Sequence, residues 1–346
     1  MPRGGLDFAG ILLCAGCSGK LSSRLRGLSR GYSSSNWAVS HSFSRQRPGV
    51  SATTQAHIIA CERIHNHRTL AGTLAMTTER PIRVGAVSYL NTKPLIHDFQ
   101  RLAPHAQLIL DYPSRLADAL ARGELDVALI PSIEFFQEPS YTIVSNACIA
   151  CRGPVLSVKL FSRVPAAEIR SLALDEGSRT SVALTRVLLK QRFGIEPKLE
   201  PLAVEHTLAD TKADAVLLIG DRAIHSPIGT FAEVWDLGDQ WCRWAERPFV
   251  FAMWTARAGT DLCGIEQALE KARDAGVAAL PQIAEREAPL LGLTQPECLA
   301  YLRDNLYFYL GPRERSGLAM FHQLAQQMQL APPGVDVGSL HLEGSS

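Results

Sequence analysis

Apolar runs of strand length alternate with helical patterns from residue 82 onward, and this alternation limits the fold more than any other feature. The order is strand 82–87, helix 92–100, strand 107–111, helix 115–122 and strand 126–130. Gly123 follows the second helical pattern, where a glycine commonly ends a helix. Strands that are joined through helices run parallel, so this order predicts a parallel sheet with helices packed on its faces.

The same alternation begins again further along the chain. This second series comprises strand 171–174, helix 181–193, and strands 198–201 and 215–219. Two longer strand-type runs, 155–162 and 249–255, flank the series, and we interpret them as segments that carry the chain between two lobes. The prediction is a two-lobed α/β fold with a ligand cleft between the lobes. Lobe one would comprise residues 82–163 plus 250–330, and lobe two residues 164–249.

The two ends of the chain differ from this pattern. Residues 1–80 are rich in Ser, Arg, Gly and His and show no sustained period, which predicts disorder. Met76 opens a natural entry into the first strand, so we interpret it as the true start of the protein. A targeting segment or a genuine extension remains as the alternative. Residues 331–346 are expected to form a flexible tail.

The overall charge excludes some classes of partner. A formal net charge of +1 over 346 residues provides no broad field to attract nucleic acid or an anionic membrane surface. No apolar run reaches the roughly 18 residues that a membrane-spanning helix needs. An anionic ligand must therefore be held by local groups.

The chain also lacks the usual signatures of metal and cofactor sites. The eight cysteines are scattered, and the pair Cys148 and Cys151 has no second pair or nearby histidine to complete a zinc site. Neither a dinucleotide-binding nor a P-loop motif is present. We therefore expect no metal and no organic cofactor.

Polar residues follow four of the predicted strands. Ligands of open α/β sheets bind beyond the carboxyl ends of strands, so these loops are candidate ligand contacts. The candidates are Ser88, Tyr89, Asn91, Thr92, Ser132, Ser178, Arg179, Thr180, Ser181, Gly220 and Asp221. The loop 177–181 is the strongest anion site, because it combines a glycine, three hydroxyls and an arginine at a helix start.

Each loop also has a purely structural interpretation. Asn91 and Thr92 could cap a helix, Ser132 could belong to a simple turn, and Asp221 could be a capping residue. Arg179 could simply be solvated. The residues alone therefore predict a two-lobed protein that closes on a small anion. They do not show whether that protein is an enzyme or a solute receptor.

Several motifs resemble the chorismate dehydratase family of the futalosine route to menaquinone. They are VSYLNTKPL (87–95), GELDVALIPSIEF (123–135), GPVLSVKLFS (153–162), TSVALTRVLL (180–189), LIGDRAI (218–224), DLGDQW (236–241) and PFVFAMW (248–254). The resemblance covers about residues 82–330. It implies the type II periplasmic-binding-protein fold and a cofactor-free loss of water from chorismate, which gives 3-(1-carboxyvinyloxy)benzoate.

The resemblance also implies roles for two of the candidates. Asn91 would bind and polarise substrate oxygens, and Ser132 would hold a carboxylate or the leaving hydroxyl. The other candidate residues would bind substrate, with the two substrate carboxylates held at helix starts. No general base maps onto the sequence, so the enolpyruvyl carboxylate of the substrate is the hypothetical proton acceptor.

Two other functions compete with this interpretation. An exported solute-binding protein of the same fold would need an export signal, for which FAGILLCAGC (8–17) is the only candidate. An effector-binding regulator would carry a basic helix-turn-helix, which residues 1–80 do not offer. We therefore expect a cytoplasmic enzyme that binds chorismate and has neither nucleic acid nor membrane as a partner. The sequence leaves the oligomeric state open.

Overall fold

A computed structural model describes residues 80–203, 206–225 and 229–333 of the chain. The expectations for residues 1–79 and 334–346, including a start at Met76, lie outside these described residues. No helix in the described ranges is both long and apolar enough to cross a membrane.

The first sheet has six strands in the order β11-β4-β10-β3-β1-β2. β1 pairs in parallel with β2 and β3, as the alternation of strands and helices predicts. β10 pairs antiparallel with both β3 and β4, so the sheet is mixed. The strands are β1 (Ile82–Val87), β2 (Ala106–Asp111), β3 (Val127–Pro131), β4 (Tyr141–Cys151), β10 (Phe249–Arg257) and β11 (Tyr307–Tyr309).

The second sheet has five strands in the order β7-β6-β8-β5-β9. β6 runs parallel to β7 and β8, whereas β5 is antiparallel to β8 and β9. The strands are β5 (Val158–Ser162), β6 (Ser171–Asp175), β7 (Lys198–Leu202), β8 (Ala215–Ile219) and β9 (Glu233–Asp236).

Sheet membership corrects one boundary of the predicted lobes. The prediction placed residues up to 163 in lobe one, but β5 belongs to the second sheet. The strand-type run 155–162 is also not one strand, because a turn at residues 155–157 precedes β5. The chain therefore crosses from the first sheet to the second between Cys151, where β4 ends, and Val158, where β5 begins.

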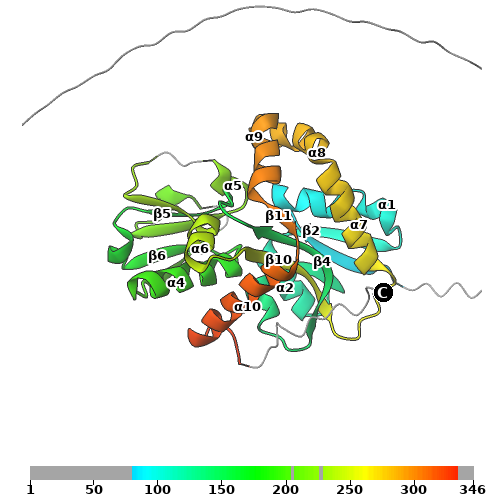
Figure 1. Cartoon of the computed structure of the whole chain (residues 1–346), viewed down its shortest axis with the longest axis horizontal. Coiled ribbons are helices and arrows are strands. Elements are labelled where there is room, and N and C mark those ends of the chain that lie inside the picture. The colour runs from blue at the N-terminus through cyan, green and yellow to red at the C-terminus, as the bar shows by residue number, and fades with distance from the viewer. Residues whose placement is uncertain (1–79, 204–205, 226–228, 334–346) are drawn as a thin grey trace, which may run out of the picture. The chain divides into compact units, whose positions relative to one another are not determined.

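Helices cover both sheets (Figure 1). α4 and α6 pack on the second sheet, and α7 packs on the first sheet and on the 3₁₀ helix η1. The elements that matter for the site are η1 (Leu90–Ile96), α2 (Pro113–Ala121), α3 (Ser132–Phe135), α4 (Arg179–Phe193), α5 (Asp221–Ile224), α6 (Leu237–Ala245), α7 (Ile265–Ala278), the π-helix η5 (Tyr301–Asn305) and α10 (Pro312–Gln327). The predicted helix end before Gly123 is confirmed, and so is the predicted end of the helix 181–193, which Gly194 follows. The two glycines have φ angles of 71° and 72°, which favour glycine.

An aromatic cluster joins elements of both sheets. Trp241 of α6 and Phe249 of β10 have ring centroids 5.1 Å apart, and Phe321 of α10 lies 4.9 Å from Phe249. All three side chains are fully buried. The core is thus continuous past the point where α6 of the second sheet leads back into β10 of the first. This buried junction brings the carboxyl ends of strands from the two sheets near one another.

Candidate functional site

A cavity lies where the carboxyl ends of β1, β3 and β8 meet the start of α4. Its walls come from both sheets, as expected for a ligand site at strand ends. The lining residues are Val87, Tyr89, Asn91, Pro113, Pro131, Ile149, Val155, Ser157, Val158, Ser178, Ser181, Ile219, Gly220, Phe251 and Ala252. The free volume of this pocket is about 50 Å³. An apolar chamber with a few polar groups is typical of a small-molecule site.

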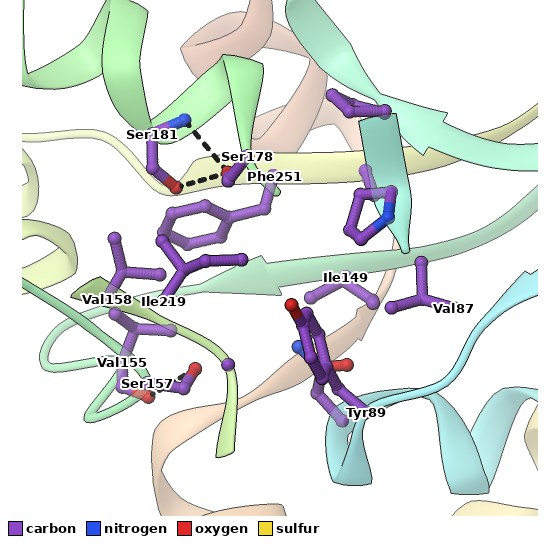
Figure 2. Close-up of a pocket in the computed structure, with 15 residues that line it drawn as sticks. Val87, Tyr89, Ile149, Val155, Ser157, Val158, Ser178, Ser181, Ile219 and Phe251 are labelled. Carbon is purple, nitrogen blue, oxygen red and sulfur yellow. Dashed lines mark hydrogen bonds between the residues drawn. The ribbon is translucent and has the colours of Figure 1, made fainter. Parts of the chain in front are cut away.

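The polar groups occupy two sides of this pocket. Figure 2 shows Tyr89 and Ser157 on one side and Ser178 and Ser181 on the other, with Phe251 between them. The pair Tyr89 and Ser157 comes from the loops that follow β1 and precede β5. The serine pair stands at the start of α4. A molecule that carries two separate anionic groups could therefore contact both sides.

Asn91 reaches the pocket from η1. Its Oδ1 atom accepts a hydrogen bond from Thr92 Oγ1 at 3.2 Å, which orients the amide group. Neither side chain caps the helix, because the N-cap is Tyr89 and no side-chain cap bond is present. The capping interpretation of Asn91 is therefore wrong. Thr92 is fully buried and lies outside the lining, so it supports Asn91 rather than facing the pocket.

Ser157 was missed by the sequence reasoning, although it lines the same pocket. Its backbone N–H donates to Val155 O at 2.7 Å, which closes a three-residue turn centred on Leu156. Leu156 has a φ of 59°, a value that residues with a side chain rarely adopt. This is the rare, strained form of the γ-turn. Strain of this kind persists mainly where function requires it, so the turn marks Ser157 as a candidate.

A buried tyrosine lies close to both Asn91 and Ser157. Tyr301, in η5, is 1% exposed, and its hydroxyl has no hydrogen-bond partner of good geometry in the described part of the chain. Burial raises the pKa of Tyr301, whereas the nearby side chains of Ser157 and Asn91 act to lower it. The three polar groups are therefore neighbours, although they come from distant parts of the sequence. Non-regular helical turns such as η5 are frequent at functional sites.

The loop before α4 combines capping with exposure to the pocket. Ser178 is the N-cap of α4, and its Oγ accepts from Ser181 N at 3.3 Å and donates to Ser181 Oγ at 2.8 Å. Both serines line the cavity, as Figure 2 shows. Thr180 is buried, and its Oγ1 accepts from Ile133 N at 3.2 Å. The start of this 15-residue helix thus faces the pocket, while Thr180 contacts α3 instead.

Arg179 does not line the pocket. Its guanidinium forms ion pairs with Asp118 of α2 at 2.8 Å and with Glu134 of α3 at 3.0 Å. In place of the predicted contact with an anionic ligand, Arg179 therefore links α4 of the second sheet to two helices of the first. Arg179 is the first residue of α4, but it is not among the residues that line this cavity, whereas its neighbours Ser178 and Ser181 are.

Ser132 lies near the pocket without lining it. It is fully buried, and its Oγ donates to Val250 O at 2.8 Å, with Thr180 Oγ1 a further 3.4 Å neighbour. Its hydroxyl is thus occupied by the backbone of β10. Ser88 is exposed and also lies outside the lining. The sequence placed both serines correctly at strand ends but could not show which way each side chain turns.

Gly220 and Asp221 connect β8 to the opposite wall. Gly220 has a φ of 69°, and a Cβ there would lie 2.7 Å from Cζ of Tyr89, so only glycine allows the tyrosine ring to approach. Asp221 Oδ1 accepts from Leu90 N at 3.1 Å, which links α5 to η1. Burial raises the pKa of Asp221, and this backbone hydrogen bond lowers it. Asp221 lies outside the lining and acts as a tie between the two sides of the cavity.

No group of three or more His, Cys, Asp or Glu residues in the described ranges could hold a metal ion. The polar groups that face the pocket are instead hydroxyls, one amide and backbone groups. They can donate hydrogen bonds to carboxylates and hydroxyls of a ligand.

The fold is similar to that of solved binding proteins. The periplasmic aliphatic sulphonate binding protein SsuA from Escherichia coli aligns with a TM-score of 0.51 and 15% identity, over 75% of this chain and 90% of that one. A Candida albicans protein with the generic periplasmic binding protein fold aligns with a TM-score of 0.50 and 10% identity, over 74% and 92% of the two chains. These alignments confirm the predicted fold.

Sequence comparisons identify the family. A family model described as menaquinone biosynthesis matches residues 82–327. A chorismate dehydratase from Thermus thermophilus is 33% identical over 260 residues, which cover 70% of this chain and 94% of the relative. A chorismate dehydratase from Campylobacter jejuni is 24% identical over 254 residues, or 71% and 99% of the two chains. The chain therefore belongs to the chorismate dehydratase family of menaquinone biosynthesis.

Proposed function

We propose that this protein is a chorismate dehydratase that converts chorismate to 3-(1-carboxyvinyloxy)benzoate and water, as a cytoplasmic enzyme of menaquinone biosynthesis. The observation that carries the proposal is the shared pocket of Asn91 and Ser157, set in an apolar wall opposite the start of α4. The chorismate dehydratases that this chain resembles support the choice of substrate.

The reaction is a loss of water that makes the substrate ring aromatic. A proton leaves the ring carbon that bears the ether oxygen, and hydroxide leaves the neighbouring carbon. The electrons of the C–H bond form the new double bond, and proton and hydroxide together make one water. Because aromatisation makes the step favourable, the protein has to lower the barrier, and holding the substrate in a reactive orientation contributes several kcal/mol.

The lining residues of the described pocket include no Asp, Glu, His, Lys or Arg that could accept the proton. The Tyr89 hydroxyl is also a poor base, because burial raises its pKa further. We therefore assign the proton transfer to the enolpyruvyl carboxylate of chorismate itself. The pocket then has to hold that carboxylate next to the ring C–H group.

Each polar group has a place in this scheme. The Asn91 amide donates to an oxygen of the substrate, and Ser157 donates to the departing hydroxyl or to a carboxylate. The N-terminus of α4, with Ser178 and Ser181, binds the other carboxylate, because a helix start presents unpaired N–H groups and partial positive charge. The apolar wall around Phe251 packs against the ring. Donors placed where charge develops contribute about 3 kcal/mol each.

The substrate must enter by a movement of the two sides of the cavity. The free volume of about 50 Å³ is far below the roughly 300 Å³ of a small-ligand pocket. The hydrogen bond from Leu90 N to Asp221 and the ion pairs of Arg179 join the two sides. Opening would break these contacts, and closing would re-form them around the substrate.

Purified protein mixed with chorismate provides the test. Loss of the diene absorbance, together with a product lighter by one water, would support the assignment. Tight binding without product would favour a solute-binding protein of the same fold instead. No binding and no product would refute both.

Three alanine variants test the roles of individual residues. Asn91→Ala and Ser157→Ala should each lower kcat by about 10²-fold, because each removes a donor from the substrate. Ser132→Ala should keep kcat within about tenfold, because Ser132 lies outside the lining and its hydroxyl donates to Val250 O at 2.8 Å. Ser157 lines the pocket, and its Oγ makes only a longer contact of 3.4 Å with Val155 O. The sequence-based role of Ser132 stays a prediction, and a loss as large as that of Ser157→Ala would favour it. Full turnover by both lining variants would refute the assignment of the site.

A further inference from the structure

We propose that Asp236 is a positioning residue that holds the Ser157 hydroxyl in the pocket by fixing the turn before it. The inference rests on the proposed function, since it assigns Ser157 to the substrate site. Asp236 itself does not line the pocket, so it would act through the turn and not on the substrate.

The carboxylate of Asp236 binds the backbone of the turn directly. Its Oδ1 accepts from Val155 N at 2.9 Å, and its Oδ2 accepts from Leu156 N at 2.7 Å. Oδ1 also accepts from Asp239 N at 3.1 Å, as the N-cap of α6. One side chain thus begins a helix and clamps two successive N–H groups of the turn.

The first residues of α6 are shaped around the same loop. A Cβ at Gly238 would lie 2.7 Å from Gly153 O and 3.0 Å from Cβ of Val155. Only glycine therefore lets the helix start approach closely enough for the Asp236 carboxylate to reach the backbone. From the other side, Asn305 Nδ2 of η5 donates to Pro154 O at 2.9 Å. Hydrogen bonds to Asp236 on one side and from Asn305 on the other thus hold the backbone of residues 154–156 in place.

The turn needs these hydrogen bonds because its backbone is unfavourable. A leucine with a φ of 59° is sterically strained, and a change to a negative φ would relieve that strain. That change would rotate the next residue, Ser157. Hydrogen bonds from two N–H groups to one ionised acceptor are strong enough to oppose the change. The hydrogen bonds to the Asp236 carboxylate therefore hold the turn in its strained conformation.

Asp236→Asn tests the proposal, with Asp214→Asn as its matched control. Asp214 Oδ2 accepts from Arg170 N and Ser171 N, both at 2.9 Å, at the start of β6 and outside the pocket lining. An asparagine turns one acceptor oxygen into an NH₂ group. Asp236→Asn therefore loses at least one backbone bond, because its bonds are divided between Oδ1 and Oδ2. In Asp214→Asn the remaining oxygen can still accept both bonds, so this control removes the charge alone. We expect kcat on chorismate to fall about 10- to 100-fold in Asp236→Asn with KM within about threefold, and Asp214→Asn to keep wild-type kcat.

A double variant separates placement from general damage. Glycine adopts a positive φ without penalty, so Asp236→Asn/Leu156→Gly should recover part of the kcat lost in Asp236→Asn. An Asp236→Asn variant with wild-type kcat would overturn the proposal. So would a double variant that recovers nothing.

Amide hydrogen exchange provides a readout that does not depend on turnover. The peptide that contains Leu156 and Ser157 should exchange faster in Asp236→Asn than in the wild type, and Asp214→Asn should leave it unchanged. Equal exchange in Asp236→Asn and the wild type would overturn the positioning role, whatever the substrate. Failure of the wild type to convert chorismate would instead refute the proposed function, so the two failures are distinguishable.

Discussion

Replacing Gly276 by alanine should reduce turnover from a position outside the pocket. Gly276 lies in α7, where this helix crosses η1, the short helix that carries Asn91. A Cβ at Gly276 would lie 1.9 Å from Pro94 O and 2.6 Å from Pro94 C. Both atoms belong to the backbone of η1, so no side-chain rotation relieves the contact. The helix η1 itself has to move.

The size of the effect follows from these distances. Ordinary contact begins at 3.4 Å, so the separation has to grow by 1.5 Å, the difference between 3.4 and 1.9 Å. Alanine favours the helix by about 1 kcal/mol over glycine, whereas overpacking of this kind costs about 3 kcal/mol. The net loss of unfolding free energy is about 2 kcal/mol. Since a misplacement of 1 Å can lower a rate about 10²-fold, kcat should fall by that order if Asn91 moves with η1.

The control is Gly317→Ala in α10. A Cβ there would lie 2.0 Å from Pro248 O, a backbone clash of the same kind that does not involve η1. Both variants should lose similar stability in urea unfolding, but only Gly276→Ala should lose most of its chorismate turnover. Equal kcat values for the two variants would refute the idea that the packing of α7 on η1 positions Asn91.

Three further predictions concern groups at and beyond the pocket. Tyr301→Phe should raise the unfolding free energy by about 1 kcal/mol, because it removes a buried hydroxyl without a good partner. The same variant should lower kcat about tenfold, because that hydroxyl lies close to Asn91 and Ser157; an unchanged kcat would show that the hydroxyl plays no part in turnover. Arg179→Gln should change KM for chorismate less than threefold, since its ion pairs are partly exposed and such pairs contribute less than about 1 kcal/mol each to closure. A tenfold rise in KM would instead favour the predicted contact between Arg179 and an anionic ligand. Burial raises the pKa of Asp126, but hydrogen bonds from Arg80 and Arg83 lower it well below its usual range. Its stabilising effect is therefore complete above about pH 4 and is lost as the pH falls further, so Asp126→Asn should lose less stability than the wild type between pH 7 and pH 3 in urea unfolding.

The parts of the fold that local pattern controls were predictable from the sequence. Apolar runs, such as the one that became β1, and the glycines at positive φ, Gly123 and Gly194, are local signals, and the structure confirms them. β4 was missed, because its buried and exposed positions do not alternate and its length depends on pairing with distant β10. The antiparallel direction of β10 likewise depends on a long-range return of the chain.

The candidate site was predictable at the level of loops but not of side chains. Asn91, Ser178 and Ser181 line the pocket that the loops predicted. Ser157 was hidden within a run that looks like one continuous strand, and only the positive φ of Leu156 and the turn it creates distinguish it. The adjacent Gly153 and Pro154 are the one local signal that could have suggested a break before it.

The turn that carries Ser157 also forms a bridge between the sheets, since β4 ends at Cys151 in one and β5 begins at Val158 in the other. Any swing of one sheet against the other must bend the backbone somewhere in this bridge. The hinge would then include Ser157, which we propose to contact the substrate, so the binding groups could not stay in place while the two sheets move apart to release product. Variants that release product faster should therefore arise in the other bridge, residues 246–248, where a looser joint leaves Ser157 undisturbed.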